Sequence, residues 1–222
     1  MELGELVGTG RSADVYAIGG GRVLRRYRRE ADTAGEAAVM AYVAGHGYPV
    51  PEVYPDEGDA TDLVMGRLSG PTMLRAVVDG ELTPEEAGAI QARLLRRLHE
   101  IPAMESSDPA DRILHLDLHP DNVMLTASGP VVIDWCNAGE GPPALDNAMS
   151  ALILAQVAVD PEFAFAPTAR STLVALAAEL GGDLDVGEPL DRVKARRDED
   201  QGLTEREAGL LGEAVELVRQ LR

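Results

Sequence analysis

The stretch ILHLDLHPDNVMLTASGPVVIDW, residues 113–135, decides the fold. Two short apolar runs, 123–125 and 131–133, flank a segment that holds serine, glycine and proline, which is typical of a turn between two strands. The sequence therefore predicts a tight hairpin. Asp134 follows the second strand, and the hairpin is expected to fold it back towards residues that precede the first strand.

The polar residues of this stretch form a recognisable pattern. His115, Asp117 and Asn122 have the spacing H-x-D-x-x-x-x-N, and Asp134 follows twelve residues later. Two carboxylates and an amide oxygen that converge repel one another unless a proton or a divalent cation enters. Oxygen ligands suit Mg²⁺ rather than zinc. The stretch thus predicts a magnesium site.

The segment HLDLHPDN with the later VIDW resembles the catalytic loop and metal strand of the protein-kinase-like superfamily, and within it the aminoglycoside phosphotransferase and choline kinase branch. The resemblance implies that Asp117 and His115 are the catalytic residues and that Asn122 and Asp134 hold the metal. For His115 we expect bracing of the loop rather than proton chemistry, and for His119 either phosphate contact or loop packing.

Composition limits the partners. The 222 residues carry a net charge of −18, which disfavours nucleic acid and anionic membranes and is compatible with a cationic small substrate or with ordinary solubility. The single cysteine, Cys136, allows no intrachain disulfide and fits a reducing cytoplasm. The N-terminal residues contain no basic or apolar run, so we expect no secretory signal. No apolar run is long enough to span a bilayer.

A glycine-rich turn stands near the start of the chain. LVGTGRSADVY, residues 6–16, approximates G-x-G-x-x-G-x-V, with Ala13 at the third glycine position. Glycines let a backbone lie close to phosphates and offer its N–H groups to them. A plain hairpin turn is the simpler reading of this stretch. Its order before the catalytic stretch favours a loop over the nucleotide, with Gly8 and Gly10 as the contacts.

The third predicted strand carries an arginine where the family carries a phosphate-binding lysine. Val-Leu-Arg at 23–25 places Arg25 in register, with Arg26 as the alternative. Arginine is a planar fork rather than a point charge, so the exchange is not conservative. A helix over 30–44 supplies Glu36 as the acid expected to pair with Arg25, with Glu30 as the alternative.

The resemblance implies an α+β, bilobal protein-kinase-like fold. A small lobe over 1–66 has an antiparallel sheet and one helix, and a larger, mainly helical lobe spans 67–222. ATP is expected between them, with backbone groups near Val64 and Met65 facing the adenine; for Met65 a plain core position is the alternative.

The larger lobe is predicted from helix signals. TPEE at 83–86 and TERE at 204–207 are capping boxes that open helices, and further helices are expected over 144–159, 167–180 and 189–197. His99 is expected to be a helix-end or core residue. Asp146 matches a family aspartate, and we expect it to hold the catalytic loop by capping the next helix.

These observations predict a small-molecule kinase. ATP and Mg²⁺ are the implied cofactors, and the acceptor is a hydroxylated molecule such as an aminoglycoside, an amino alcohol or a sugar. The short Gly- and Pro-rich segment after Trp135 lacks a closing Ala-Pro-Glu, which argues against a protein kinase. The alternative is a nucleotide-binding pseudokinase or regulatory module without phosphotransfer, because Arg25 and Ala13 depart from the family pattern.

Overall fold

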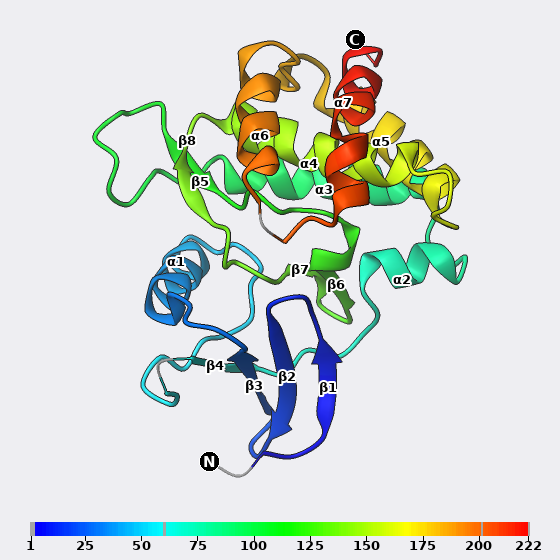
Figure 1. Ribbon diagram of the computed structural model, residues 1–222. Helices are drawn as coiled ribbons and strands as arrows, with labels where there is room; N and C mark the ends of the chain where they lie inside the picture. The colour runs from blue at the N-terminus through cyan, green and yellow to red at the C-terminus, as the bar shows by residue number, and fades with distance from the viewer. Residues whose placement is uncertain (1–2, 60, 201, 222) are drawn as a thin grey trace. The chain divides into compact units, whose positions relative to one another are not determined.

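The computed structural model describes residues 3–59, 61–200 and 202–221 (Figure 1). The strands are β1 (Leu6–Thr9), β2 (Ala13–Ile18), β3 (Arg22–Tyr27), β4 (Asp62–Gly66), β5 (Arg112–Leu114), β6 (Val123–Thr126), β7 (Gly129–Val132) and β8 (Gly139–Gly141). The helices are α1 (Thr33–Gly45), α2 (Met73–Val78), α3 (Pro84–Leu98), α4 (Pro143–Val159), α5 (Ala166–Leu180), α6 (Glu188–Asp198) and α7 (Glu205–Arg219), with short 3-10 turns η1 (Pro120–Asn122) and η2 (Gly181–Asp183).

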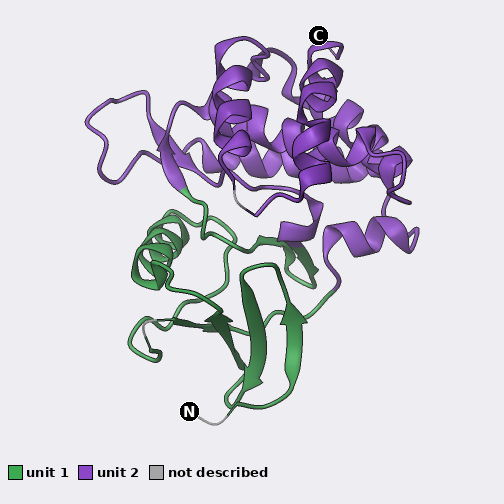
Figure 2. Ribbon diagram, viewed as in Figure 1, with its two compact units in different colours: residues 1–70, 124–138 green, residues 71–123, 139–222 purple. Residues whose placement is uncertain are grey.

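The chain divides into two compact units, coloured separately in Figure 2. Unit 1 comprises Met1–Gly70 and Met124–Ala138, and unit 2 comprises Pro71–Val123 and Gly139–Arg222. Backbone pairing explains why 124–138 belongs with the first 70 residues, since the Val132 N–H donates to Pro49 O at 2.8 Å. The division into lobes at residues 66 and 67 stays a prediction.

Unit 1 is built on an antiparallel sheet with the strand order β1-β2-β3-β4. Gly20 and Gly21 both have positive φ, 75° and 71°, between β2 and β3. Ile18 pairs with Arg22, so the connection has three residues, and glycine takes the left-handed conformation at two of them without steric cost. The turn sets the β2–β3 register, in which Arg25 lies opposite Val15 on one side and Leu63 on the other.

Helix α1 belongs to the same unit. Asp32 begins it by accepting the Gly35 N–H at 2.8 Å, and the chain leaves it through Gly47 at φ 77°. Periodicity predicts that Val39, Met40 and Val43 face the core. Met40 and Val43 are buried and Val39 is half-buried, and the buried Glu36 lies on the same face as Met40 and Val43. One turn of α1 therefore places a carboxylate within an otherwise apolar face.

Unit 2 is a helical assembly around α4, whose residues Asp146–Gln156 are all buried. Both predicted capping boxes are present, with Thr83 and Glu86 opening α3 and Thr204 and Glu207 opening α7. Gly88 lets α3 approach α5 closely, because an added Cβ would lie 2.7 Å from the Ala175 Cβ. Among the described residues, no helix combines the length and the apolar character that crossing a bilayer requires.

A small sheet, β5–β8, leads into the catalytic stretch. β8 lies in the short Gly- and Pro-rich segment that follows Trp135. Glu140 of β8 accepts hydrogen bonds from the N–H groups of Met104, Glu105 and Ser106. Partial burial acts to raise the pKa of this carboxyl, but the three backbone donors outweigh it and lower the pKa. The loop before β5 is thereby tied to β8.

Candidate active site

The catalytic loop, residues 115–119, follows β5 in unit 2 and is held from behind by Asp146 of α4. This carboxylate is fully buried and accepts the N–H groups of His115 at 2.9 Å and Leu116 at 2.7 Å. Leu116 has φ 59°, a left-handed conformation that costs a leucine about 1–3 kcal/mol. Asp146 offsets this cost with two charge-assisted hydrogen bonds.

Asp146 does not cap α4. Pro142 occupies the cap position and α4 has no side-chain cap, so the capping role predicted for Asp146 is wrong. The predicted hold on the loop is confirmed, but it acts through loop N–H groups about 30 residues away in sequence. His99 at the end of α3 contributes its Nε2, 3.1 Å from Asp146 Oδ2, as expected of a helix-end histidine. Burial by itself raises the pKa of Asp146, but its hydrogen bonds with His99 and the loop lower it.

The carbonyl groups of the loop are held as well. Asn122 donates its amide N–H to Asp117 O at 2.9 Å and to Asp117 Oδ2 at 3.3 Å. Gln91, fully buried on α3, donates to Leu118 O at 2.8 Å. Gln91 could not be identified from the sequence, because one amide on an amphipathic helix carries no local signal for a partner 27 residues away. Asp117 thus stands on a backbone fixed at Leu116 and Leu118.

The two histidines of the loop have structural contacts. His115 is fully buried, and its Nδ1 accepts the Asp117 N–H at 3.3 Å, which is the bracing role expected of it. His119 Nδ1 accepts the Asp121 N–H at 3.3 Å and caps η1. His119 Nε2 also lies 4.0 Å from Asp117 Oδ1. The two roles considered for His119 were phosphate contact and loop packing, and its contacts within unit 2 are those of loop packing.

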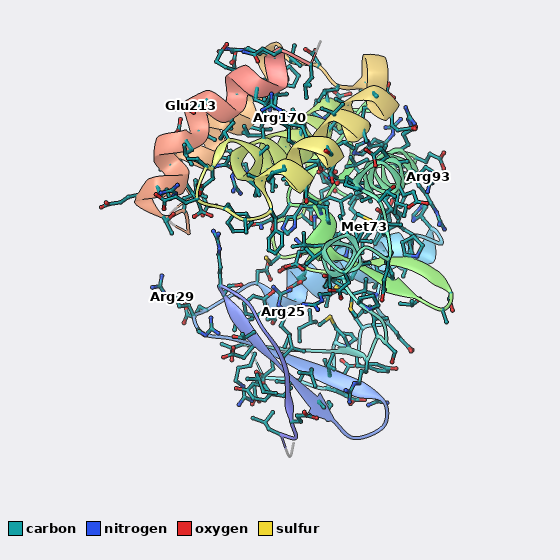
Figure 3. The ribbon with its side chains drawn as sticks, turned by 90° about the vertical axis from the view of Figure 1, so that its right-hand side faces the viewer. Arg25, Arg29, Met73, Arg93, Arg170 and Glu213 are labelled. Carbon is teal, nitrogen blue, oxygen red and sulfur yellow. The ribbon has the colours of Figure 1, made fainter. Side chains whose placement is uncertain are left out.

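In unit 1, the buried guanidinium of Arg25 joins two carboxylates; Figure 3 labels Arg25 on the strands of this unit. Nη1 donates to Glu36 Oε1 at 3.0 Å, and Nη2 donates to Asp134 Oδ1 at 2.5 Å. Asp134 has φ 65°, which an aspartate tolerates better than most residues. The ion pair predicted between Arg25 and Glu36 is therefore present, and Asp134 shares it.

Burial and charge act in opposite directions in this cluster. Burial alone lowers the pKa of Arg25, but the charges of Asp134 and Glu36 overcome it and raise the pKa further. Burial raises the pKa of Glu36, and the positive charge of Arg25 limits that rise. Cys136 is exposed as a residue, but desolvation of its sulfur and the Asp134 carboxylate raise the pKa of the thiol to about 12, so the sulfur keeps its proton and donates to Asp134 at 3.0 Å.

The structure decides between Arg25 and Arg26, and between Glu36 and Glu30, as members of the predicted ion pair. Arg26 forms a two-pronged pair with Asp62 of β4, at 2.8 and 2.7 Å. Glu30 is exposed, and Figure 3 shows the nearby Arg29 extending from the chain after β3. Arg25 and Glu36 are therefore the residues that occupy the buried positions of the predicted pair.

The glycine-rich turn connects β1 and β2. Gly8 and Gly10 have room around them, since an added Cβ would meet nothing nearer than 3.6 Å. Arg28 after β3 donates to the carbonyls of Gly10 at 2.7 Å and Arg11 at 2.9 Å. Arg28 thus fixes the turn through its carbonyls, and the Gly10 N–H donates to Ala13 O at 2.9 Å within the turn.

The residues predicted near the adenine lie on β4. Val64 is buried and its carbonyl accepts the Tyr54 N–H at 2.9 Å, while Met65 is half-buried. The next two N–H groups are engaged, since Gly66 donates to Glu52 O at 2.8 Å and Arg67 donates to Gly21 O at 2.9 Å. Adenine binding near Val64 and Met65 stays a prediction.

Residues 4–113 and 103–190 match the phosphotransferase enzyme family, APH. The chain belongs to this family. A comparison with curated proteins found no match.

Solved structures show that this phosphotransferase-family chain has the protein-kinase-like fold predicted from the sequence. A thermostable mutant of aminoglycoside phosphotransferase APH(4)-Ia, in a ternary complex with AMP-PNP and hygromycin B, matches with a TM-score of 0.60 at 15% identity, over 97% of this chain and 92% of that one. The gentamicin complex of APH(2″)-IIa matches with a TM-score of 0.59 at 14% identity, over 99% and 91%. A choline/ethanolamine kinase family protein from Mesorhizobium loti matches with a TM-score of 0.57 at 17% identity, over 98% and 88%.

The donor chemistry of the predicted metal residues fits Mg²⁺ in this phosphotransferase family member. The Asn122 amide nitrogen is used by Asp117, so its oxygen is the atom it can offer a cation. Asp134 offers a carboxylate. Among the described residues, no group of three or more His, Cys, Asp or Glu side chains could hold a metal. Two oxygen donors suit Mg²⁺, which keeps waters and substrate phosphates as its other ligands.

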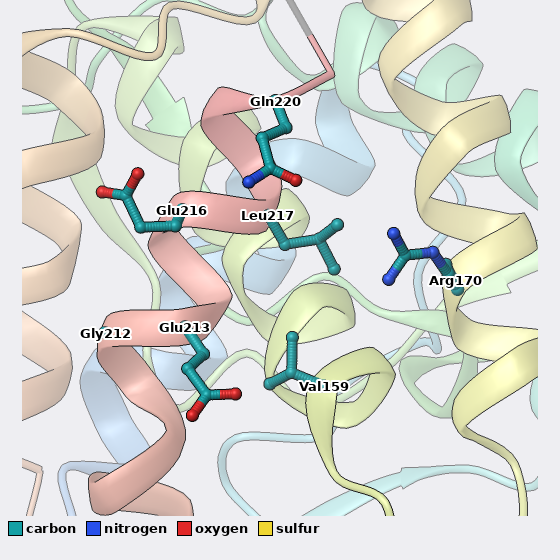
Figure 4. Close-up of a pocket in the computed structure, with 7 residues that line it drawn as sticks. All are labelled: Val159, Arg170, Gly212, Glu213, Glu216, Leu217 and Gln220. Carbon is teal, nitrogen blue, oxygen red and sulfur yellow. The ribbon is translucent and has the colours of Figure 1, made fainter.

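A surface pocket in unit 2 lies apart from the catalytic loop (Figure 4). Val159 at the end of α4 and Leu217 of α7 form its apolar floor, and Arg170 of α5 stands across from the glutamates of α7. None of its lining residues comes from 115–122. The pocket is therefore separate from the site that the sequence predicts.

Proposed function

We propose that this protein transfers the γ-phosphoryl group of ATP to a hydroxyl group of a small molecule. The observation that carries the proposal is the mounting of Asp117. Its backbone is held at Leu116 by Asp146 and at Leu118 by Gln91. A catalytic base for phosphoryl transfer must be positioned before the substrate arrives, because most of the catalysis is positioning and charge neutralisation.

Asp117 accepts the proton of the acceptor hydroxyl in this proposal. Its carboxylate is half-buried, and Asn122 donates to Oδ2 at 3.3 Å while His119 Nε2 lies 4.0 Å from Oδ1, so both contacts restrict its orientation. His115 keeps the peptide of Asp117 in place through its Nδ1. His115 is thus a brace rather than an acid or a base.

Asn122 and Asp134 would hold Mg²⁺, which neutralises the phosphate charge when bound. Arg25 remains protonated at any working pH, so it contributes charge and hydrogen bonds and no proton. Gly8 and Gly10 would approach the phosphates, and Val64 and Met65 would contact the base. These assignments rest on the family pattern and on the contacts within each unit.

The acceptor in this proposal is a small hydroxylated molecule. The net charge of −18 is compatible with a positively charged one and disfavours nucleic acid. Solved relatives in complex with hygromycin B and gentamicin support an aminoglycoside-like acceptor. A choline/ethanolamine kinase family relative supports an amino alcohol.

A nucleotide-binding module without phosphotransfer is the second candidate. Arg25 favours it, because an arginine stands where the family carries a lysine and its fork is engaged by Glu36 and Asp134. The intact Asp117, Asn122 and Asp134 favour the enzyme.

The test combines binding and turnover. Thermal unfolding with Mg²⁺-ATP should raise the midpoint by mass action, and chelation of the metal or Asp134→Ala should abolish the rise. ADP release is then measured with a panel of aminoglycosides, amino alcohols and sugars, with Asp117→Asn as the inactive control. Binding without turnover on any acceptor would favour the second candidate, and the absence of binding would refute both.

A further inference from the structure

Glu36 uses its two carboxylate oxygens for different partners. Oε1 accepts Arg25 Nη1 at 3.0 Å and the Trp135 N–H at 3.2 Å. Oε2 accepts the hydroxyl of Tyr27 at 2.5 Å. The side chains of Arg25 and Glu36 are only 8% and 3% exposed, so water cannot easily replace any of these donors. Every oxygen of Glu36 is therefore assigned to a protein group.

The same strand provides a comparison for how an arginine meets a carboxylate. Arginine and a carboxylate prefer two parallel hydrogen bonds. Arg26 follows this preference with Asp62, through Nε and Nη2. Arg25 does not, because it gives Nη1 to Glu36 and Nη2 to Asp134. Something in its surroundings prevents the two-pronged pair.

We propose that Tyr27 is a positioning residue that keeps the guanidinium of Arg25 shared between Glu36 and Asp134. Its hydroxyl donates to Oε2 of Glu36, the oxygen that the second arm of the fork would need for a two-pronged pair, and so competes with that arm. The second arm is then available to Asp134. Nothing in the family pattern of the sequence identified Tyr27, which is neither a ligand nor an acid in the proposed reaction.

The geometry of β3 places Tyr27 for this role. Tyr27 and Arg25 are two residues apart on one strand, so their side chains lie on the same face. The guanidinium carbon of Arg25 lies 4.7 Å from the centroid of the Tyr27 ring, within the range of a cation–π contact. Burial and the neighbouring Glu36 raise the pKa of the Tyr27 hydroxyl, so it keeps the proton that it donates.

The consequence falls on Asp134. Its side chain is 31% exposed and also accepts the Cys136 thiol, so the contact with Arg25 is one of the interactions that restrict this carboxylate. Under the proposed function Asp134 is a metal ligand, and Tyr27 acts on it through Arg25. This last step rests on the proposed function, while the sharing of Arg25 does not.

The sharing is tested by double-mutant cycles for unfolding in urea, without nucleotide and with a chelator. The substitutions Arg25→Met and Asp134→Asn, made singly and together, give the coupling energy between these two residues. The cycle is measured once in the wild-type background and once in the Tyr27→Phe background. With Tyr27 we expect a coupling of about tenfold or more in the unfolding equilibrium constant. With Tyr27→Phe it should fall below about threefold, and the Arg25–Glu36 coupling, measured with Glu36→Gln, should rise.

Tyr54 is a matched control. Its hydroxyl donates to Glu52 at 2.7 Å and the guanidinium carbon of Arg22 lies 4.0 Å from its ring centroid, but this group is near the surface and does not include Asp134. Tyr54→Phe should leave the Arg25–Asp134 coupling unchanged. An unchanged coupling in Tyr27→Phe, or an equal loss in Tyr54→Phe, overturns the proposal.

A crystal structure of Tyr27→Phe keeps the test decisive if Arg25→Met does not fold. We expect both arms of Arg25 on Glu36 and none on Asp134, and an arm that remains on Asp134 refutes the proposal. Calorimetric titration with Mg²⁺-AMP-PNP then tests the functional step, where Tyr27→Phe should weaken binding about tenfold. Altered coupling without any nucleotide binding would uphold the role of Tyr27 and refute the proposed function. An unchanged Arg25–Asp134 coupling in Tyr27→Phe together with normal nucleotide binding would refute the role of Tyr27 and uphold nucleotide binding under the proposed function.

Discussion

Replacing Asp146 by asparagine tests how the catalytic loop is held. Asparagine keeps the shape of the side chain but exchanges one acceptor oxygen for an NH₂ group. That group would face either the N–H of Leu116 or the N–H of His115 and His99, all of which now point at carboxylate oxygens. A buried donor would then have no acceptor.

The expected cost follows from the number of contacts. A hydrogen bond to a charged group contributes about 1.5–3 kcal/mol, and at least one of the two backbone bonds is lost. Where the new NH₂ group faces Leu116, this left-handed residue also loses the partner that offsets its own cost of about 1–3 kcal/mol. We expect a decrease of about 3–5 kcal/mol in the free energy of unfolding, which is the usual effect of breaking a buried charged contact.

Urea unfolding at neutral pH measures the effect, with Asp79→Asn as the control. Asp79 pairs with Arg75 on the surface at 2.6 Å, and its loss should cost less than about 1 kcal/mol. A decrease below about 1 kcal/mol for Asp146→Asn would refute the anchoring role. Because the folded pKa of Asp146 is lowered, its contribution is present above the ordinary aspartate pKa and disappears as pH falls through the folded value. The gap between wild type and variant should therefore close in acid.

Three further predictions follow from separate contacts. Gly88→Ala should lower the free energy of unfolding by about 1–3 kcal/mol, because the added Cβ overlaps α5. Gly209→Ala in α7, where nothing lies within 4 Å of the added Cβ, should raise the free energy of unfolding by up to about 1 kcal/mol. If thermal unfolding showed that both substitutions change stability in the same direction, the close packing of α3 against α5 would be contradicted. Glu140→Gln should reduce the hydrogen-exchange protection of the N–H groups of Met104, Glu105 and Ser106, which donate to this side chain. In the wild type the same protection should be lost as pH falls through the lowered pKa of Glu140. Protection that did not depend on pH would exclude the Glu140 carboxylate as the acceptor. Asp117→Asn should reduce phosphoryl transfer by about 10²–10⁴-fold and leave nucleotide binding intact, which stopped-flow and calorimetric measurements separate.

Much of unit 1 could be predicted because its signals are local. The glycine turn before β3, the apolar pair near the start of β3 and the apolar face of α1 depend on residues close in sequence. They place Arg25 and Glu36 on neighbouring elements, and their ion pair is present. Strand alternation also places Tyr27 on the face of Arg25, which is the signal that could have identified it.

The remaining contacts of the site could not be predicted. Asp146 was expected at a helix cap because capping is the local role of an aspartate near a helix start, yet its acceptors serve N–H groups about 30 residues away. Gln91 and Glu140 likewise act on distant backbone. No local pattern encodes such partners, because tertiary packing brings them together.

The sequence by itself determined the family, the order of the elements and the residue types at the candidate site. Those depend on motif spacing, turn residues and capping boxes, each of which acts over a few residues. Only the tertiary structure decided how Arg25 divides its fork and why Leu116 can be left-handed. Both depend on buried carboxylates from other elements, whose strong hydrogen bonds exist only after the chain has excluded water from them.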